Sequence, residues 1–250
     1  VIFRPELHDA GEKVILGNRG TFGPLDVADV VLDLHPEGAV SARYVAWRLA
    51  TFLYRPDPEP EVVEAMAGAF AGSGYEIKSM VRTLLLRSEF TDGPGNTIKS
   101  PAEFVAGAMR ALGLVATPTL GTRYRELDEL ATFCAAMGQA LYNPPNVSGW
   151  KGGASWANTA TTLSRYNFSA RVARLVTDDV VAAVLAAAGG EPRETTGPWM
   201  ARLGLLELVP STHGALSRYL DESAAAGTDP PTRTRGVLTL LLASPDYNLR

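Results

Sequence analysis

The stretch from Leu127 to Leu141, LDELATFCAAMGQAL, decides the fold class. Apolar residues recur in it at steps of three and four, and this spacing places them on one face of an α-helix. The recurring residues are Leu127, Leu130, Cys134, Met137 and Leu141. We therefore predict a helix from about Thr122 to Gln139.

Helical spacing dominates the rest of the chain, and convincing strand alternation is hard to find. The clearest start is SPAE, Ser100 to Glu103, where Ser can cap the helix, Pro occupies its first position and Glu can return a hydrogen bond to the cap. Ser41 is a plausible cap for the helix that carries Val45, Leu49, Phe52 and Leu53. The same spacing is found in Val63, Met66 and Phe70 after Pro58 and Pro60, and in Ile77, Met80, Val81, Leu84 and Leu85. Further helices are expected near 161–176, 178–188, 198–208, 211–226 and 232–243. The prediction is an all-α fold of about ten helices with one long Pro/Gly/Trp-rich loop.

A polar Gly/Pro stretch, GGEPRETTGP at 189–198, suggests a soft domain boundary. Residues 1–188 would form the main helical body, and residues 199–250 a smaller helical subdomain. Two segments resemble each other: LLLRSEF at 84–90 and LLLASPDY at 240–247. They are either copies of one unit or a common way to stop a helix, and we favour the second because repeat architectures show several copies.

Composition is that of an ordinary globular protein, with 250 residues, 46% of them hydrophobic and 20% charged. The net charge of −4, without a Lys/Arg cluster, argues against nucleic-acid binding. The longest apolar run, Val180 to Ala188, is far shorter than the roughly 20 residues of a membrane-spanning helix. The first residues, VIFRPELHDAGEK, contain no signal peptide.

Few residues suggest chemistry. The single cysteine, Cys134, excludes an internal disulfide, and its place on an apolar helix face suggests a buried thiol. His8, His35 and His213 are widely spaced, so we predict no metal site and no cofactor. HDAGEK, which begins with His8 and Asp9, could serve a metal, a phosphate or proton transfer, or could tie a loop to a helix end, and we favour the structural role.

Two other motifs have a structural and a functional interpretation. Arg43 and Trp47 are four residues apart on a predicted helix, so the guanidinium can lie over the indole. This is usually a surface clasp, and it would gain interest if the loop at 142–156 folded against it. Ser155 in GGASWA lacks the second glycine and the strand that a nucleophile elbow requires.

The segment YNPPNVSGWKGGASW, Tyr142 to Trp156, is unlike its helical surroundings. Its prolines hold the chain extended, and Asn146 with the Gly149–Trp150 pair can close a tight turn. Indoles serve equally as core plugs and as ligand platforms. We expect Trp156 to be the plug, and Trp150 to stay partly exposed and line a cleft with Asn146.

Several segments together resemble domain-of-unknown-function family 1800, a group of large bacterial proteins. They include the continuous stretch MGQALYNPPNVSGWKGGASWANTATTLSRYNF, and Pro-Pro-Asn-Val-x-Gly-Trp within it is specific. The others are HDAGEKVILG, SARYVAWRLATFL, SGYEIKSMVRTLLLRSEF, IKSPAEFVAGAMRALGL and LTLLLASPDY. The resemblance runs from about His8 to Tyr247. Ala10 and Lys151 depart from it, since members often have Pro there.

The resemblance implies an exported protein about twice this length, of which this chain is the C-terminal half. It supplies no mechanism. We expect an exported binding or scaffold protein that uses the loop and the Arg43/Trp47 helix to recognise an exported protein or a glycan. The chain would associate with the missing N-terminal half or with itself. The alternative is a hydrolase or metal-assisted enzyme using the His8/Asp9 region. Candidate ligand-binding residues are His8, Asp9, Arg43, Trp47, Asn146 and Trp150.

Overall fold

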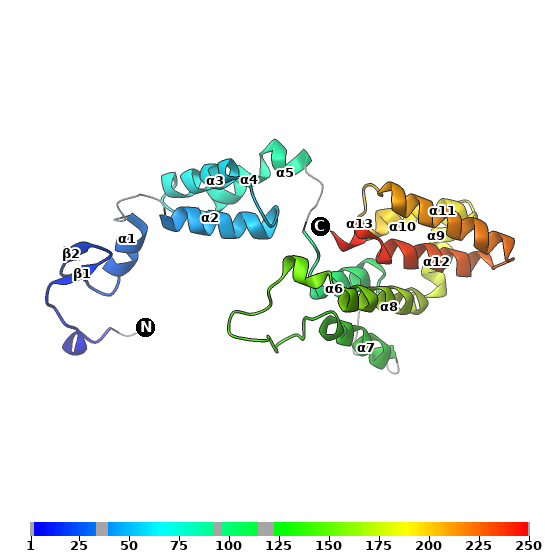
Figure 1. Cartoon of the computed structure of the whole chain (residues 1–250), viewed down its shortest axis with the longest axis horizontal. Coiled ribbons are helices and arrows are strands. Elements are labelled where there is room, and N and C mark those ends of the chain that lie inside the picture. The colour runs from blue at the N-terminus through cyan, green and yellow to red at the C-terminus, as the bar shows by residue number, and fades with distance from the viewer. Residues whose placement is uncertain (1–2, 34–39, 93–96, 115–122, 250) are drawn as a thin grey trace. The chain divides into compact units, whose positions relative to one another are not determined.

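The computed structural model describes residues 3–33, 40–92, 97–114 and 123–249. The chain divides into two compact units, Val1–Asn96 and Thr97–Arg250, called unit 1 and unit 2 here. Both units are helical, and the described residues contain thirteen α-helices beside a single two-stranded sheet (Figure 1). The expected all-α class is confirmed.

Unit 1 begins with a short hairpin and continues as helices. Strands β1 and β2 are antiparallel, with Val14 opposite Arg19. They turn at Leu16 and Gly17, both of which have positive φ, and Gly17 adopts this conformation at no steric cost. The elements of unit 1 are the 3-10 helix η1 (Pro5–Leu7), β1 (Lys13–Ile15), β2 (Asn18–Gly20), α1 (Asp26–Asp33), α2 (Val40–Leu53), α3 (Pro60–Gly72), α4 (Ile77–Leu85) and α5 (Ser88–Asp92).

The core of unit 1 lies where α2, α3 and α4 meet, and the fully buried residues of α2 are all alanines. Ala42, Ala46 and Ala50 are fully buried against a cluster that includes Met66 and Met80. The small side chains allow the backbones of α2 and α3 to approach closely. The predicted apolar stripe of α2 is therefore wrong, because Val45, Phe52 and Leu53 are exposed and Leu49 is only partly buried. Ser41 is not the cap either, since it lies inside α2 and its hydroxyl donates to the carbonyl of Val31 at 2.9 Å.

Unit 2 is a larger helical unit with a continuous core. Helix α12 packs against α8, α9, α10 and α11 (Figure 1). Its elements are α6 (Pro101–Ala111), α7 (Arg123–Ala136), η3 (Gly153–Trp156), α8 (Thr159–Leu175), α9 (Asp178–Ala187), η4 (Pro192–Thr195), α10 (Thr196–Leu203), α11 (Pro210–Ala225), α12 (Pro230–Ala243) and α13 (Pro245–Asn248). The largest buried side chains of the core are Phe104, Leu112, Leu130, Met137, Phe168, Trp199, Leu238, Leu241 and Tyr247.

The structure divides the chain at 96/97 and not at the predicted boundary of 189–198. Pro192 and Thr195 within that segment are buried, and one core cluster contains residues from both sides of it, from Phe104 to Tyr247. The segment contains η4 and the start of α10 within a single unit, although its composition is polar.

Sequence signals placed the helix starts of unit 2 well. Ser100 accepts from the backbone N–H of Glu103, and the Glu103 carboxylate accepts from the Ser100 N–H at 2.8 Å, which is the predicted capping box. Helix α7 ends at Ala136, so Leu141 lies beyond it and is 47% exposed. The side chain of Leu127 lies outside the described part of the chain, as does His35.

Candidate functional site

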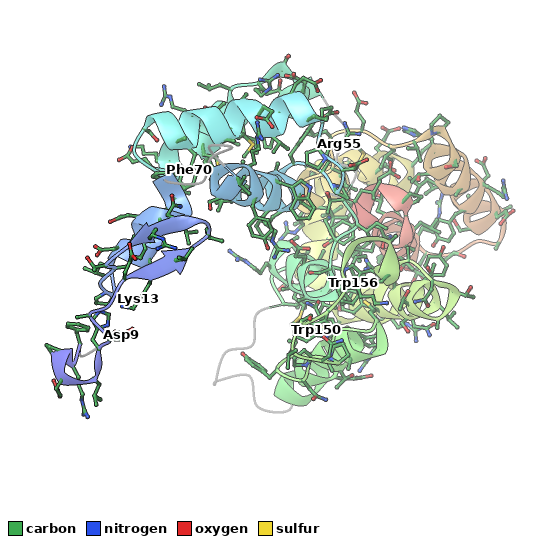
Figure 2. The ribbon with its side chains drawn as sticks, turned by 60° about the vertical axis from the view of Figure 1, so that its left-hand side comes forward. Asp9, Lys13, Arg55, Phe70, Trp150 and Trp156 are labelled. Carbon is green, nitrogen blue, oxygen red and sulfur yellow. The ribbon has the colours of Figure 1, made fainter. Side chains whose placement is uncertain are left out.

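His8 and Asp9 close the turn that leads into β1. Asp9 Oδ1 accepts from the backbone N–H of Gly11 at 2.8 Å, and the Lys13 ammonium donates to the carbonyls of Asp9 and Gly11 (Figure 2). The Gly11 hydrogen bond, together with the Lys13 charge, lowers the pKa of Asp9. The His8 ring contacts Phe3 edge to face, with 5.4 Å between ring centroids. These contacts favour a structural role for the pair.

Arg43 and Trp47 lie on the outward side of α2. The Arg43 guanidinium pairs with Glu64 of α3, with Nε 2.8 Å from Oε1. Among the described contacts of Arg43 this ion pair takes the place of the stacking that the four-residue spacing predicts. Trp47 instead lies beside Tyr44, with 6.4 Å between ring centroids, and both rings are largely exposed. Tyr44 and Trp47 therefore form an apolar surface feature of unit 1.

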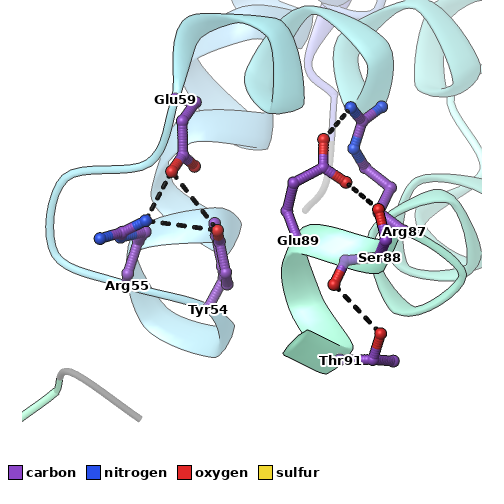
Figure 3. A network of polar contacts seen from close by, with 7 residues as sticks. All are labelled: Tyr54, Arg55, Glu59, Arg87, Ser88, Glu89 and Thr91. Atoms are coloured by element: carbon purple, nitrogen blue, oxygen red, sulfur yellow. Dashed lines mark hydrogen bonds and ion pairs between the residues drawn. The ribbon is translucent and has the colours of Figure 1, made fainter. Parts of the chain in front are cut away.

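Two polar clusters, which the sequence analysis missed, surround the ends of α2 and α4 (Figure 3). In the first, Arg55 pairs with Glu59, and both contact the Tyr54 hydroxyl. In the second, Arg87 pairs with Glu89. Each pair lowers the pKa of its glutamate, although for Glu59 the largest cause is a backbone hydrogen bond. Arg–Glu pairs of this kind lock the helix ends, and they resemble structural networks more than catalytic groups.

The loop from Tyr142 to Trp156 in unit 2 has a rigid base and an exposed tip. Asn146 Oδ1 accepts from the N–H of Ser148 at 2.8 Å, and the Asn146 carbonyl accepts from Gly149 at 3.0 Å, which closes the predicted turn. Tyr142 and Val147 are fully exposed, and Trp150 is half-buried (Figure 2). Ser155 donates to the Gly152 carbonyl at 2.7 Å, a local turn bond.

Trp156 is the anchor of this loop. Its side chain is 6% exposed, and its ring covers Gly138, where an added Cβ would lie 3.6 Å from the indole. Gly138 has φ +94°, a conformation that other residues rarely adopt. The Thr161 hydroxyl donates to the Trp156 carbonyl at 2.8 Å, and Asn158 caps α8. The predicted burial of Trp156 and partial exposure of Trp150 are confirmed.

A second feature that sequence reasoning missed is a pair of cations in unit 2, the buried Arg165 and the partly buried Lys99. Arg165 is 3% exposed, and its guanidinium donates to Asn248 Oδ1 at 2.9 Å and to the Lys99 carbonyl at 2.8 Å. The guanidinium carbon lies 4.7 Å from the centre of the Phe104 ring. The Lys99 ammonium donates to the carbonyl of Tyr247 and lies 3.8 Å from the centre of its ring.

Neither cation forms an ion pair with a carboxylate in the part of the chain that the structure describes. The acceptors of Arg165 are neutral, and its Nε is buried without a hydrogen-bond partner. Burial lowers the pKa of Arg165, because the charged guanidinium has lost solvent. One signal could have found Arg165: it occupies the buried stripe of α8 that otherwise holds Thr161, Phe168 and Val172.

Two hollows adjoin these residues. The first has a volume of about 260 Å³ and is lined by Arg165, Trp156, Ile98 and Asn248, among others. The second has about 480 Å³ and is mainly apolar, with Leu240 and Ala215 in its wall. Tyr166, Ala243 and Pro245 line both hollows, so the hollows adjoin, and together they are called the α8–α12 groove here. Neither Asn146 nor Trp150 is among its lining residues.

Comparison with models of protein families identifies the family of this chain. The model of the family described as a protein of unknown function (DUF1800) matches residues 1–249. The chain belongs to the DUF1800 family. Searches against curated proteins and against solved structures gave no significant match. No helix in the described ranges of this DUF1800 chain is long and apolar enough to cross a membrane.

The DUF1800 chain holds no group of three or more His, Cys, Asp or Glu side chains suited to a metal, as far as its described residues go. His213 lies exposed on α11, and Asp9 is held by Gly11 and Lys13. We expect no stoichiometric zinc in protein purified without added metal, because a tight zinc site needs about four converging ligands. Elemental analysis checks this. One tightly held zinc per chain would contradict the prediction and favour the metal-assisted alternative.

Lys99 is expected to contribute a rise in the stability of unit 2 between about pH 8 and pH 10, while the raised pKa of buried Cys134 acts in the opposite direction. Burial lowers the pKa of Lys99 from its ordinary value of 10.5 to about 8, against the opposing charge of Glu103. In this window Lys99 binds more protons in the unfolded chain than in the folded chain, so its contribution to the free energy of unfolding increases with pH. Because the side chain is only partly buried, solvent screening reduces the gain to about 1–2 kcal/mol. Above about pH 10 the gain reverses, since burial raises the pKa of Tyr247.

Urea unfolding at a series of pH values measures this slope. The matched variant Lys99→Met removes the titrating group and should flatten the curve between pH 8 and pH 10. An unchanged slope in that variant would show that another group titrates.

Proposed function

We propose that this DUF1800 protein is an exported binding or scaffold protein whose recognition surface is the loop from Tyr142 to Trp156. One observation carries the proposal: the loop is anchored at its base by buried Trp156, while Tyr142 and Val147 are fully exposed. An exposed aromatic ring on a fixed backbone is a common feature of recognition surfaces, since it offers a large contact area at a low entropic cost.

The backbone of the loop supports this role. The bonds from Ser148 and Gly149 to Asn146 fix the turn before any partner arrives, which lowers the cost of ordering the loop on binding. Tyr, Asn, Ser, Gly and Trp, which make up most of the segment, are also the residues enriched in antibody binding loops. These features favour a protein surface as the partner.

Site-specific photo-crosslinking in the host cell tests the loop. A benzophenone side chain at position 142 or 147 is expected to give a discrete adduct with another protein. Leu206, a 94% exposed residue in the turn between α10 and α11, is the matched control position and should give none. Asn146→Ala, which removes the turn acceptor, should weaken the adduct. Equal labelling from all three positions, or an adduct with a glycan alone, would contradict a protein partner.

The outward side of α2 in unit 1 supports the association part of the proposal. Tyr44 and Trp47 are 61% and 43% exposed. Val40, which lies one helical turn before Tyr44, is 41% exposed. Adjoining apolar side chains of this size mark interfaces. We propose that this side contacts the N-terminal half of the longer protein or a second copy of the chain.

Sedimentation of the purified chain tests this contact. We expect the chain to self-associate. The double variant Tyr44→Ser, Trp47→Ser should reduce this self-association, and the control variant Leu206→Ser should leave it unchanged. Self-association equal in all three proteins would argue against the α2 side.

Export belongs to the same proposal, and fractionation of cells that express the complete gene checks it. The protein should be found in the periplasmic or extracellular fraction. Retention of all of it in the cytoplasm would contradict export.

A further inference from the structure

The α8–α12 groove offers two different environments along one path. At one end, Arg165 brings a buried positive charge next to Trp156 and Ile98. At the other end the wall is mainly apolar, with Leu240, Ala215 and Tyr166, although Ser211, Thr212, Thr239 and Ser244 also line it. Both volumes, about 260 and 480 Å³, are of the order of known ligand pockets, which span about 300–1,000 Å³.

The charge of the groove is not balanced from within. A buried cation normally has a carboxylate partner, because an isolated charge away from water is costly. Arg165 has only two neutral oxygen acceptors and an aromatic face, and its Nε has no partner. Lys99, whose carbonyl accepts from Arg165, adds a second positive charge nearby, which the charge of Glu103 opposes in part. An anionic group at this end would balance the charge of Arg165.

We propose that the α8–α12 groove binds a small molecule that carries a carboxylate and an unbranched apolar chain. The carboxylate lies at the Arg165 end, and the chain passes Tyr166 and Ala243 into the apolar end. A carboxylate fits because a guanidinium donates to it with matching geometry and because one negative charge meets one guanidinium. This site is separate from the tip of the 142–156 loop and does not depend on its partner.

Tryptophan fluorescence of the purified chain detects such binding, since Trp156 lines the charged end. Decanoate and its uncharged analogue decan-1-ol are the probes. We expect decanoate to bind at least tenfold more tightly than decan-1-ol, and to bind more tightly than octanoate by about fourfold for each added methylene that is buried. A bromine at the second carbon of decanoate should quench Trp156 more strongly than a bromine at the end of the chain, because it lies beside the carboxylate.

Variants separate the two ends. Arg165→Gln should abolish the preference for decanoate over decan-1-ol. Arg235→Gln is the control, since Arg235 donates to the carbonyls of Ala173 and Val176, forms an ion pair with Asp178, and does not line the groove. Ala215→Phe, at an exposed position of α11, should fill the apolar end and remove the dependence on chain length. Trp156→Phe should remove the quenching by the bromine at the second carbon.

The wild-type protein alone can overturn the proposal, so it stays testable if Arg165→Gln does not fold. Equal affinity for decanoate and decan-1-ol would exclude the carboxylate site. Affinity that does not change in Ala215→Phe would show that the chain lies elsewhere. Absence of binding at probe concentrations just below micelle formation would overturn the proposal as a whole.

Discussion

Replacing Trp156 with alanine should lower the free energy of unfolding of unit 2 by about 3–5 kcal/mol, as truncation of a buried aromatic does. The indole is 6% exposed and covers Gly138, so its removal leaves a cavity at the junction of the loop with the start of α8. The backbone cannot collapse into it freely, because Thr161 and Asn158 hold the start of the helix. Urea unfolding followed by the fluorescence of Trp199 measures the loss.

Trp150→Ala is the matched control for this result, since Trp150 belongs to the same loop and is half-buried. It should cost about 1 kcal/mol, which is typical of a substitution outside the core. Acrylamide quenching should decrease in Trp150→Ala, because the variant loses an accessible indole. Equally large destabilisation by both substitutions, with unchanged quenching, would mean that the loop is only a structural corner.

Replacing Tyr247 with alanine is expected to destabilise unit 2 by a similar amount, about 3–5 kcal/mol. The ring is 2% exposed, meets Phe104 edge to face at 5.3 Å and lies under the Lys99 ammonium. Its loss removes packing and also leaves a partly buried cation without its aromatic partner. Urea unfolding followed by tryptophan fluorescence measures it, since three of the four tryptophans belong to unit 2.

Two further variants help to interpret the Tyr247→Ala result. Tyr247→Phe keeps the ring and removes only a 3.4 Å hydrogen bond to the Phe104 carbonyl, so it should cost less than about 1.5 kcal/mol. Phe90→Ala changes the corresponding aromatic of the similar segment in unit 1, which is only partly buried beside Tyr54. It should cost about 1–2 kcal/mol. If Tyr247→Phe were as harmful as Tyr247→Ala, the hydroxyl would matter more than the ring.

The similar segments at 84–90 and 240–247 end their helices in related ways. In each, a serine begins a further short helix, α5 at Ser88 and α13 after Ser244. Ser244 Oγ accepts from the N–H of Tyr247, and the aromatic then packs onto its own unit. Tyr247 is thus a core residue of unit 2.

Local signals allowed most of the fold of unit 2 to be predicted. The capping residues Ser100 and Asn158 each act through their own next three residues, so the sequence contains all the atoms that matter. Helix faces are different, because a face is buried by whatever the fold brings against it. On α2 the fold brings α3 close to the three alanines, and the larger apolar residues that the spacing favoured remain exposed.

The candidate sites depended on contacts far apart in the chain. The bonds of Arg165 reach Lys99 and Asn248, and no spacing rule links these three positions. The sequence-predicted residues His8, Asp9, Arg43, Trp47, Asn146 and Trp150 lie in two separate units, and their role in ligand binding stays a prediction. The four-residue spacing of Arg43 and Trp47 predicted a stacked pair. It could not predict the ion pair of Arg43 with Glu64, which belongs to another helix.

The backbone contact between Lys99 and Asn248 matters for the engineering of unit 2. The Lys99 N–H donates to the Asn248 carbonyl at 2.8 Å, and Ile98 forms a bridge with Leu249, so the two ends of the unit lie side by side. A chain with neighbouring ends tolerates circular permutation. A short linker from 249 to 97, with new termini opened in the exposed turn at Gly189–Gly190, should give a permuted unit with the same helices. Unit 2 could also be inserted as a cassette into a surface loop of a host protein.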